Sequence, residues 1–210
     1  MKAIIFDLDG VICHTDEYHY QAWKAMADSM GIPFDREINN RLRGVSRMAS
    51  LEIILEQYHE ELSQAEKEAL ATQKNELYKE SLKNMSPADL SDEVKTTLDA
   101  LRDRGYMLAI GSSSKNAPFI LQQLGLGSYF DAISDGNNII RSKPDPEVFV
   151  KAAQMLCIAP EECLVVEDAV SGAIAGKRGG MTVACVGDAS AEKAGDYNLA
   201  SFAQLLEIAR

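Results

Sequence analysis

The sequence has few of the features that mark membrane, secreted or nucleic-acid-binding proteins. Its 210 residues include four cysteines without a Cys-x-x-Cys pair, and no apolar run approaches the ~18 residues of a membrane span. The first apolar run ends at Asp7, well short of the ~7–15 residues of a signal-peptide core. Asp and Glu outnumber Lys and Arg by 32 to 21, so the chain lacks the basic surplus that nucleic-acid backbones attract. We therefore expect a soluble, cytoplasmic monomer with reduced thiols and no membrane or nucleic-acid partner.

The chain does contain an alternation of strand and helix signals. Short apolar runs rich in β-branched residues lie at 3–6, 107–110, 164–166 and 181–186, a pattern typical of buried strands. Helix signals separate them: Ser91 precedes an acidic turn, and Asp145-Pro146 and Ala169 each open another helical stretch. Strands that alternate with helices predict an α/β protein with a Rossmann-like parallel sheet, covered on both faces.

Residues 15–86 interrupt this alternation with helical patterns alone. Ser63-Gln64-Ala65-Glu66 is a capping box, which predicts a long helix reaching about Lys83. We therefore predict a core domain made of residues 1–14 and 87–210, and an all-helical domain of residues 15–86 inserted after the first strand.

Polar residues follow the predicted strands. The first strand leads into Asp7 and Asp9, the second into the segment 112–116, and the run at 164–166 into Glu167-Asp168. Open parallel sheets bind ligands at the carboxyl ends of their strands, so these groups should share one rim with Lys143. Clustered carboxylates need a cation, and oxygen ligands beside a phosphate suit Mg²⁺.

This rim would suit phosphoryl transfer. Asp7 beside the metal is a candidate nucleophile, and Asp9 is a candidate for proton transfer. Ser112 and the backbone N–H groups after it would hold phosphate oxygens, and Lys143 would balance their charge. Taken singly, each residue has a plainer explanation: Asp is common in turns, and Asp168 would fit a helix N-cap. Their combination, each near a strand end, favours the catalytic interpretation.

The inserted helices carry two further signals. Thr15, His19 and Trp23 recur at every fourth residue and so form one stripe on a helix that starts near the rim. The alternative is that Thr15 only caps the helix and Trp23 belongs to the core. In the segment 42–50, Arg47 offers a planar fork for a second phosphate, beside Ser46 or Ser50 at a helix start. The alternative there is a joining loop with an exposed arginine.

The motifs Asp7-Leu8-Asp9-Gly10-Val11, Ser112, Lys143-Pro144 and Glu167-Asp168, in this order, resemble the four-motif signature of the haloacid dehalogenase superfamily. The likeness covers nearly the whole chain. Asp9 resembles the general acid/base of the phosphotransferase branch, and the inserted helices resemble a cap domain. The stripe at Thr15 and His19, and the segment Gly44-Val45-Ser46-Arg47, resemble the cap of sugar phosphomutases in that superfamily.

This resemblance implies a Mg²⁺-dependent mutase that interconverts β-glucose 1-phosphate and glucose 6-phosphate through an aspartyl-phosphate on Asp7 and a β-glucose 1,6-bisphosphate intermediate. It implies Asp9 as acid/base, and Thr15 and His19 as the link between cap closure and Asp9. It assigns the metal to the Asp7 carboxylate, the Asp9 backbone carbonyl, Glu167 and Asp168. The implied binding residues are Arg47 for the non-reacting phosphate, Ser112, Asn116 and Lys143 for the reacting one, and Trp23, Arg43, Gly44, Val45, Ser46, Ser50, Lys74, Ser113, Ser114 and Lys115 for the rest of the substrate.

Two other functions are open at this point. A Mg²⁺-dependent sugar-phosphate phosphatase would use the same core chemistry but would not need a second phosphate anchor at Arg47. A catalytically inactive phosphosugar-binding module would lack Asp7 or Asp9, and both are present. The departures from the resembling pattern, Cys13-His14, Arg43 and Ser113, bear on sugar specificity more than on the type of reaction.

Overall fold

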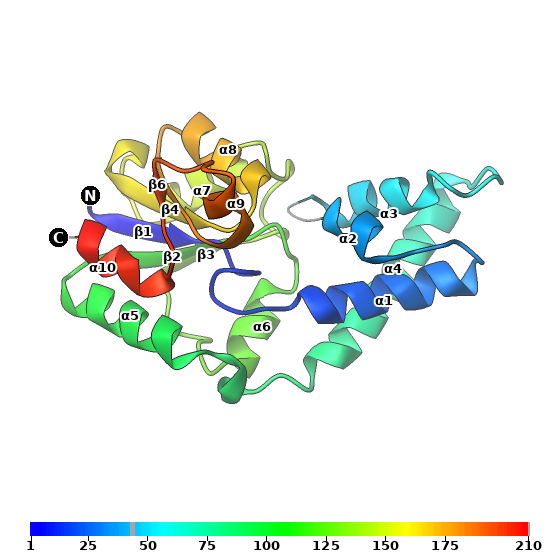
Figure 1. Ribbon diagram of the computed structural model, residues 1–210, viewed down its shortest axis with the longest axis horizontal. Coiled ribbons are helices and arrows are strands. Elements are labelled where there is room, and N and C mark those ends of the chain that lie inside the picture. The colour runs from blue at the N-terminus through cyan, green and yellow to red at the C-terminus, as the bar shows by residue number, and fades with distance from the viewer. Residues whose placement is uncertain (43–44, 210) are drawn as a thin grey trace.

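The computed structural model describes residues 1–42 and 45–209 (Figure 1). Arg43 and Gly44, which the sequence analysis assigns to substrate binding, lie outside the described residues. The elements in chain order are β1 Ala3–Phe6, α1 Asp16–Ser29, α2 Arg36–Asn40, α3 Arg47–Leu55, α4 Gln64–Leu82, η1 Pro87–Asp89, α5 Asp92–Asp103, β2 Met107–Gly111, α6 Ala117–Gln123, β3 Ala132–Ser134, α7 Glu147–Met155, η2 Pro160–Glu162, β4 Cys163–Glu167, α8 Val170–Arg178, β5 Thr182–Cys185, α9 Gly187–Ala191, β6 Tyr197–Asn198, η3 Phe202–Gln204 and α10 Leu205–Ile208, where η marks a 3-10 helix.

Within these described ranges, β1 lies in the middle of a six-stranded parallel sheet with the order β3-β2-β1-β4-β5-β6. Ala3 pairs with Met107 of β2 on one side and with Cys163 of β4 on the other. Ile4 and Ile5 pack into separate cores on opposite faces of the sheet. Because both faces are covered, β1 is apolar throughout. The predicted parallel α/β fold is confirmed, and the loops after β1, β2 and β4 meet at one edge.

Some local details differ from the sequence-based expectation. Strands β3 and β6 were not predicted, because each is short and lies at an edge, where its neighbour rather than an apolar run defines it. The helix that Asp145-Pro146 was predicted to open begins at Glu147, with Pro146 at its N-cap position rather than as its first residue. Ala169, not Asp168, is the N-cap of α8, so the helix-cap explanation of Asp168 is wrong.

Helices α1 to α4 form a layer beside the carboxyl end of the sheet (Figure 1). Their apolar side chains make a buried cluster of their own, which includes Trp23, Leu51 and Ala71. The predicted capping box at the start of α4 is present: Ser63 Oγ accepts from the backbone N–H of Glu66, and the Glu66 carboxylate accepts from the backbone N–H of Ser63 at 2.8 Å. The layer therefore has its own apolar interior and leaves one side facing the sheet.

Three of the four cysteines, Cys13, Cys163 and Cys185, are buried free thiols, as the sequence predicts, whereas Cys157 is exposed. Among the helices of the described residues, none combines the length and the apolar character needed to cross a membrane.

Candidate active site

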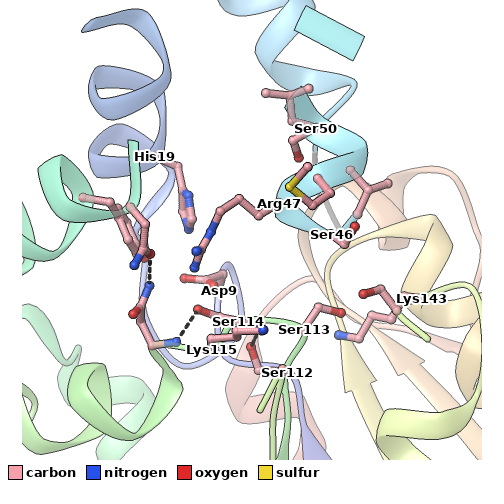
Figure 2. Close-up of a pocket in the computed structure, with 18 of the residues that line it drawn as sticks. Asp9, His19, Ser46, Arg47, Ser50, Ser112, Ser113, Ser114, Lys115 and Lys143 are labelled. Atoms are coloured by element: carbon pink, nitrogen blue, oxygen red, sulfur yellow. Dashed lines mark hydrogen bonds between the residues drawn. The ribbon is translucent and has the colours of Figure 1, made fainter. Parts of the chain in front are cut away.

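A cavity of about 570 Å³ opens between the carboxyl edge of the sheet and the helical layer. Of the site residues that the sequence analysis selected, the cavity wall contains Asp7, Asp9, His19, Trp23, Val45, Ser46, Arg47, Ser50, Lys74, Ser112, Ser113, Ser114, Lys115, Asn116, Lys143, Glu167 and Asp168. Thr15 is fully buried and does not line this wall. Figure 2 shows Arg47 reaching into the cavity from the start of α3, above Ser112 and Ser113.

Three buried carboxylates meet at the sheet end of the cavity. Asp7 follows β1, Glu167 ends β4, and with Asp168 they offer oxygen atoms within 4.8 Å of one another. Lys143 Nζ lies 2.5 Å from Asp7 Oδ1 and 2.5 Å from Glu167 Oε1. Burial raises the pKa of the Asp7 carboxyl well above its usual range, and the Lys143 ammonium opposes this rise. Burial disfavours the charged form of Lys143, but the two carboxylates outweigh it and raise the Lys143 pKa.

The chemistry of this cluster fits a divalent cation. Three buried carboxylates whose oxygen atoms lie within 4.8 Å of one another repel each other, and a bound metal would relieve this repulsion. Two glycines leave room for the carboxylates: a Cβ at Gly10 would lie 2.1 Å from Asp168 Oδ2, and one at Gly172 would lie 1.8 Å from Glu167 Oε1. Gly10 also has φ +84°, a conformation that favours glycine. Hard oxygen ligands of this kind suit Mg²⁺.

Asp9 faces the other side of the cavity floor and is held from the helical layer. The Thr15 hydroxyl donates a hydrogen bond to Asp9 Oδ1. Thr15 occupies the N-cap position of α1, but its side chain makes no capping hydrogen bond. The alternative explanation, in which Thr15 only caps this helix, is therefore wrong, because its hydroxyl donates to Asp9 instead of capping the helix. Burial raises the pKa of Asp9, and the hydrogen bond from Thr15 opposes that rise.

The loop after β2 is ordered by its own hydroxyl groups. Ser112 Oγ accepts from the backbone N–H of Ser114 at 3.1 Å, and Ser114 Oγ accepts from the backbone N–H of Asn116 at 3.2 Å. Among the described residues, Ser113 Oγ is buried without a hydrogen-bond partner. A serine hydroxyl that accepts one bond keeps its own proton to donate. This loop can therefore donate several hydrogen bonds to an anion beside Lys143.

The helical layer presents a second basic region. Lys74 is buried, its Nζ lies 2.9 Å from His19 Nδ1, and it sits over the ring of Trp23 at 4.7 Å. Burial lowers the Lys74 pKa to about 7, with a further contribution from the Arg47 guanidinium. Burial also lowers the pKa of His19 well below its usual range. In the described part of the chain neither Lys74 nor Arg47 forms an ion pair, so both are available to an anionic ligand.

The segment 45–50, which leads into α3, differs in detail from the expectation. Ser46, and not Ser50, caps α3: its Oγ accepts from the backbone N–H of Ala49 at 3.2 Å. Ser50 lies inside the helix, where it is buried and lines the cavity. The cap places Arg47 at the first position of α3, pointing into the cavity rather than into a loop exposed to solvent (Figure 2).

Sequence reasoning missed several cavity residues, among them Tyr78, Asn75, Ile139 and Ile140. Tyr78 stacks on His19 with a centroid distance of 4.0 Å, and its buried hydroxyl has no hydrogen-bond partner among the described residues. Its position one helical turn after Lys74 is the signal that could have identified it. Ile139 and Ile140 also line the cavity, and Ile140 is 95% exposed. No pattern in the sequence marks these two.

Comparisons with known proteins agree with this geometry. A family model described as haloacid dehalogenase-like hydrolase matches residues 1–180. A β-phosphoglucomutase of Bacillus subtilis is 43% identical over 189 residues, which cover 89% of this chain and 84% of that protein. A phosphorylated carbohydrates phosphatase of Thermotoga maritima is 29% identical over 184 residues, covering 86% and 82%. The crystal structure of a β-phosphoglucomutase from Clostridium difficile matches with a TM-score of 0.91 at 35% identity, over 98% of this chain and 93% of that one.

Proposed function

Because the chain belongs to the haloacid dehalogenase-like hydrolase family, we propose that it catalyses the β-phosphoglucomutase reaction, the interconversion of β-D-glucose 1-phosphate and D-glucose 6-phosphate. The observation that carries this proposal is a single cavity with anion-binding groups on two walls. Ser112 and Lys143 lie on the sheet wall, and Arg47 and Lys74 lie on the helical wall. A sugar that carries phosphate at one end and reacts at the other matches this arrangement.

We propose that residues 15–86 act as a cap over a core made of residues 1–14 and 87–210. The cap supplies the wall with Arg47, and the core supplies the reacting groups. Closing such a cavity excludes water, which protects a reactive acyl phosphate from hydrolysis. The chain crosses between the two parts twice, near residues 13–16 and 85–89, and these two crossings are the proposed hinges.

In this mechanism Asp7 is the nucleophile and carries the phosphoryl group as an aspartyl-phosphate. The C6 hydroxyl of β-glucose 1-phosphate attacks that phosphorus, the Asp7 oxygen leaves, and Asp9 accepts the hydroxyl proton. The product is β-glucose 1,6-bisphosphate, which turns over in the cavity. Asp7 then attacks the C1 phosphoryl group, and Asp9 returns the proton to the departing C1 oxygen, giving glucose 6-phosphate. One residue serves as base and then as acid, as a reversible transfer requires.

The other residues hold the groups that react. Ser112, Asn116 and Lys143 bind the transferring phosphoryl group, and the unpartnered Ser113 hydroxyl adds a donor. Arg47 binds the phosphate that does not react. The sugar lies against Trp23, Val45, Ser50, Lys74 and the segment 113–115. Mg²⁺, held by the carboxylates of Asp7, Glu167 and Asp168 with the Asp9 backbone carbonyl, would neutralise negative charge on the nucleophile and the phosphoryl oxygens.

A sugar-phosphate phosphatase is the second candidate, since the Thermotoga maritima relative carries that name. It would use Asp7 and Asp9 in the same way but would admit water to the phosphorylated enzyme. The mutase passes the phosphoryl group to a sugar, whereas the phosphatase passes it to water. The anion-binding groups on the helical wall, Arg47 and Lys74, favour the mutase.

The test is one reaction with two readouts. The full chain is incubated with β-glucose 1-phosphate, MgCl₂ and a trace of β-glucose 1,6-bisphosphate, while glucose 6-phosphate and inorganic phosphate are measured together. Rapid formation of glucose 6-phosphate with little inorganic phosphate supports the mutase. Release of inorganic phosphate without glucose 6-phosphate would contradict it and support the phosphatase.

A further inference from the structure

The loops that follow the neighbouring strands β2 and β3 leave the sheet side by side. The strands pair in parallel with Gly111 opposite Ser134, and the Ser112 backbone N–H donates to the Ser134 carbonyl at 3.0 Å. Every residue of the loop after β2, residues 112–116, lines the cavity. Of the loop after β3, residues 135–138, which the structure describes in full, only Gly136 does so. The second loop therefore lies behind the first and can act on a substrate through it.

The contact between the two loops is close enough to require glycine. The Gly136 backbone N–H donates to the Ser114 carbonyl at 3.3 Å. A Cβ at Gly136 would lie 2.5 Å from the Ser113 carbonyl oxygen and 3.0 Å from the Lys115 backbone nitrogen. No side chain fits in that space, so the backbone of the loop after β2 rests directly on the loop after β3.

Asn137 ties the two loops together beside this contact. Its Nδ2 donates to the Lys115 backbone carbonyl at 2.9 Å and to Asp135 Oδ2 at 3.1 Å. Both neighbours are acceptors, so the amide nitrogen, and not the amide oxygen, must face them. The other carboxylate oxygen of the buried Asp135 accepts from the Asn137 backbone N–H at 2.8 Å. Asp135 therefore holds the Asn137 amide in the orientation in which its second proton reaches Lys115.

These bonds fix two consecutive carbonyl groups of the loop after β2, those of Ser114 and Lys115. Because a peptide unit is planar, a fixed carbonyl also fixes the N–H group of the next residue. The Lys115 N–H donates to no protein group in the described part of the chain, and the Asn116 N–H donates to Ser114 Oγ at 3.2 Å. Figure 2 shows Lys115 beside Ser112 and Ser114, on the side of the cavity opposite Arg47. The tied segment is therefore part of the core wall of the cavity.

We propose that Asn137 is a positioning residue for substrate binding: its hydrogen bond to the Lys115 carbonyl holds the loop after β2 in its binding conformation before the substrate arrives. The inference rests on the proposed function in taking this loop as a substrate-binding wall. A loop that is ordered in advance loses less conformational freedom on binding, so the benefit goes to affinity. Once the substrate is bound, its own contacts order the loop, and the rate of the chemical step no longer depends on Asn137.

The test combines amide hydrogen exchange of the ligand-free full chain with steady-state kinetics on β-glucose 1-phosphate in MgCl₂. Asn137→Ala removes the donor, and Asn137→Asp keeps the shape but has no N–H group. Asn198→Ala is the matched control, because Asn198 Nδ2 also donates to a backbone carbonyl, that of Gly195 at 3.2 Å, but at the exposed surface outside the cavity. We expect both Asn137 variants to raise the exchange rates of the Ser114 and Asn116 N–H groups, and the KM, about three- to tenfold, with kcat within about twofold of the wild type. Asn198→Ala should leave all of these near the wild-type values.

Three results would overturn the inference. Unchanged exchange in both Asn137 variants would show that the loop does not depend on Asn137. Faster exchange with an unchanged KM would show that the order of the loop does not serve the substrate. A kcat that falls as much as KM rises would show that Asn137 supports the reacting groups instead. Failure of the proposed function is seen separately: if the wild type releases inorganic phosphate without forming glucose 6-phosphate, the mutase is wrong, and KM and kcat of the same variants are then measured from phosphate release.

Discussion

The Thr15 hydroxyl donates its hydrogen bond to Asp9, across the connection between β1 and α1. Thr15 is the residue immediately before the first cap helix, and Asp9 is the proposed acid/base. Because the side chain of Thr15 does not cap α1, its contribution is to the orientation of Asp9 rather than to the helix. Any movement of α1 therefore changes the environment of Asp9 directly.

Replacing Thr15 with Val should lower kcat by roughly tenfold or more, because Val keeps the shape but has no hydroxyl to orient Asp9. Stability should change by only about 1 kcal/mol, the usual net value of one hydrogen bond. The coupled mutase assay and thermal unfolding measure the two effects. Ser81→Ala is the control, since the Ser81 hydroxyl donates to the Leu77 backbone carbonyl on α4 and Ser81 does not line the cavity. An unchanged kcat in Thr15→Val would contradict this link.

Lys143→Met should destabilise the protein strongly. Lys143 contacts Asp7 and Glu167, which are buried, and removing it leaves their charges without a counter-ion. Loss of one partner from a buried pair costs about 3–5 kcal/mol, whereas an exposed pair such as Lys24 with Asp28 is worth at most about 1 kcal/mol. Urea unfolding measures the free energy of unfolding of Lys143→Met and of Lys24→Met. Adding MgCl₂ should restore part of the lost stability in Lys143→Met but not in Lys24→Met. Equal losses in the two variants would show that the cluster does not need the lysine charge.

The parallel fold and the sheet side of the cavity could be predicted because local pattern determines them. Each of the predicted residues lies next to a buried element: Asp7 follows β1, Glu167 ends β4 and Lys143 precedes α7. Parallel strands must bring their carboxyl ends to one edge of the sheet. No contact with a distant segment has to be known for that conclusion. The edge strand β3 was missed for the opposite reason, since its pairing with β2 defines it.

The cap side could be predicted only in part. The spacing of Thr15 and His19 identified a stripe, but the partner of the Thr15 hydroxyl depends on how the chain crosses from β1 to α1. Tyr78 and the bond between Asn75 and Asn116 depend on how α4 packs against the core, which no spacing within α4 reports. Tertiary packing, rather than local propensity, decides these contacts.

Acidification should destabilise the wild type through His19. Burial, with the positive charges of Lys74 and Arg47 nearby, lowers the His19 pKa in the folded protein, whereas an unfolded His titrates near ~6.5. As the pH falls through that value, the unfolded chain binds a proton that the folded protein does not, so the free energy of unfolding decreases. Between pH 7 and 5.5 this loss should reach about 1 kcal/mol more in the wild type than in His19→Asn. His59→Asn, at an exposed position, is the control and should keep the wild-type slope.

Arg47→Ala should separate the mutase from simple phosphate-ester hydrolysis. Arg47 is the first residue of α3 and lines the cavity across from the carboxylate cluster, so it contacts only a substrate that spans both walls. A small ester such as p-nitrophenyl phosphate needs the groups on the sheet wall alone. We expect kcat/KM for β-glucose 1-phosphate to fall roughly 100-fold, in line with the ~1.5–3 kcal/mol of a charge-assisted hydrogen bond, and hydrolysis of the small ester to change less than about threefold.

Arg41→Ala is the matched control for this comparison, because Arg41 is also a cap arginine but pairs with Glu56 at the exposed surface at 2.7 Å. It should leave both activities near the wild-type values. Arg47→Lys adds a second comparison: it keeps the charge but loses the planar fork, so it should recover only part of the mutase activity. An equal loss of both activities in Arg47→Ala would mean that the arginine supports the fold of the cap or the reacting site itself. The second phosphate anchor would then have to be sought elsewhere on the helical wall, where Lys74 is a candidate.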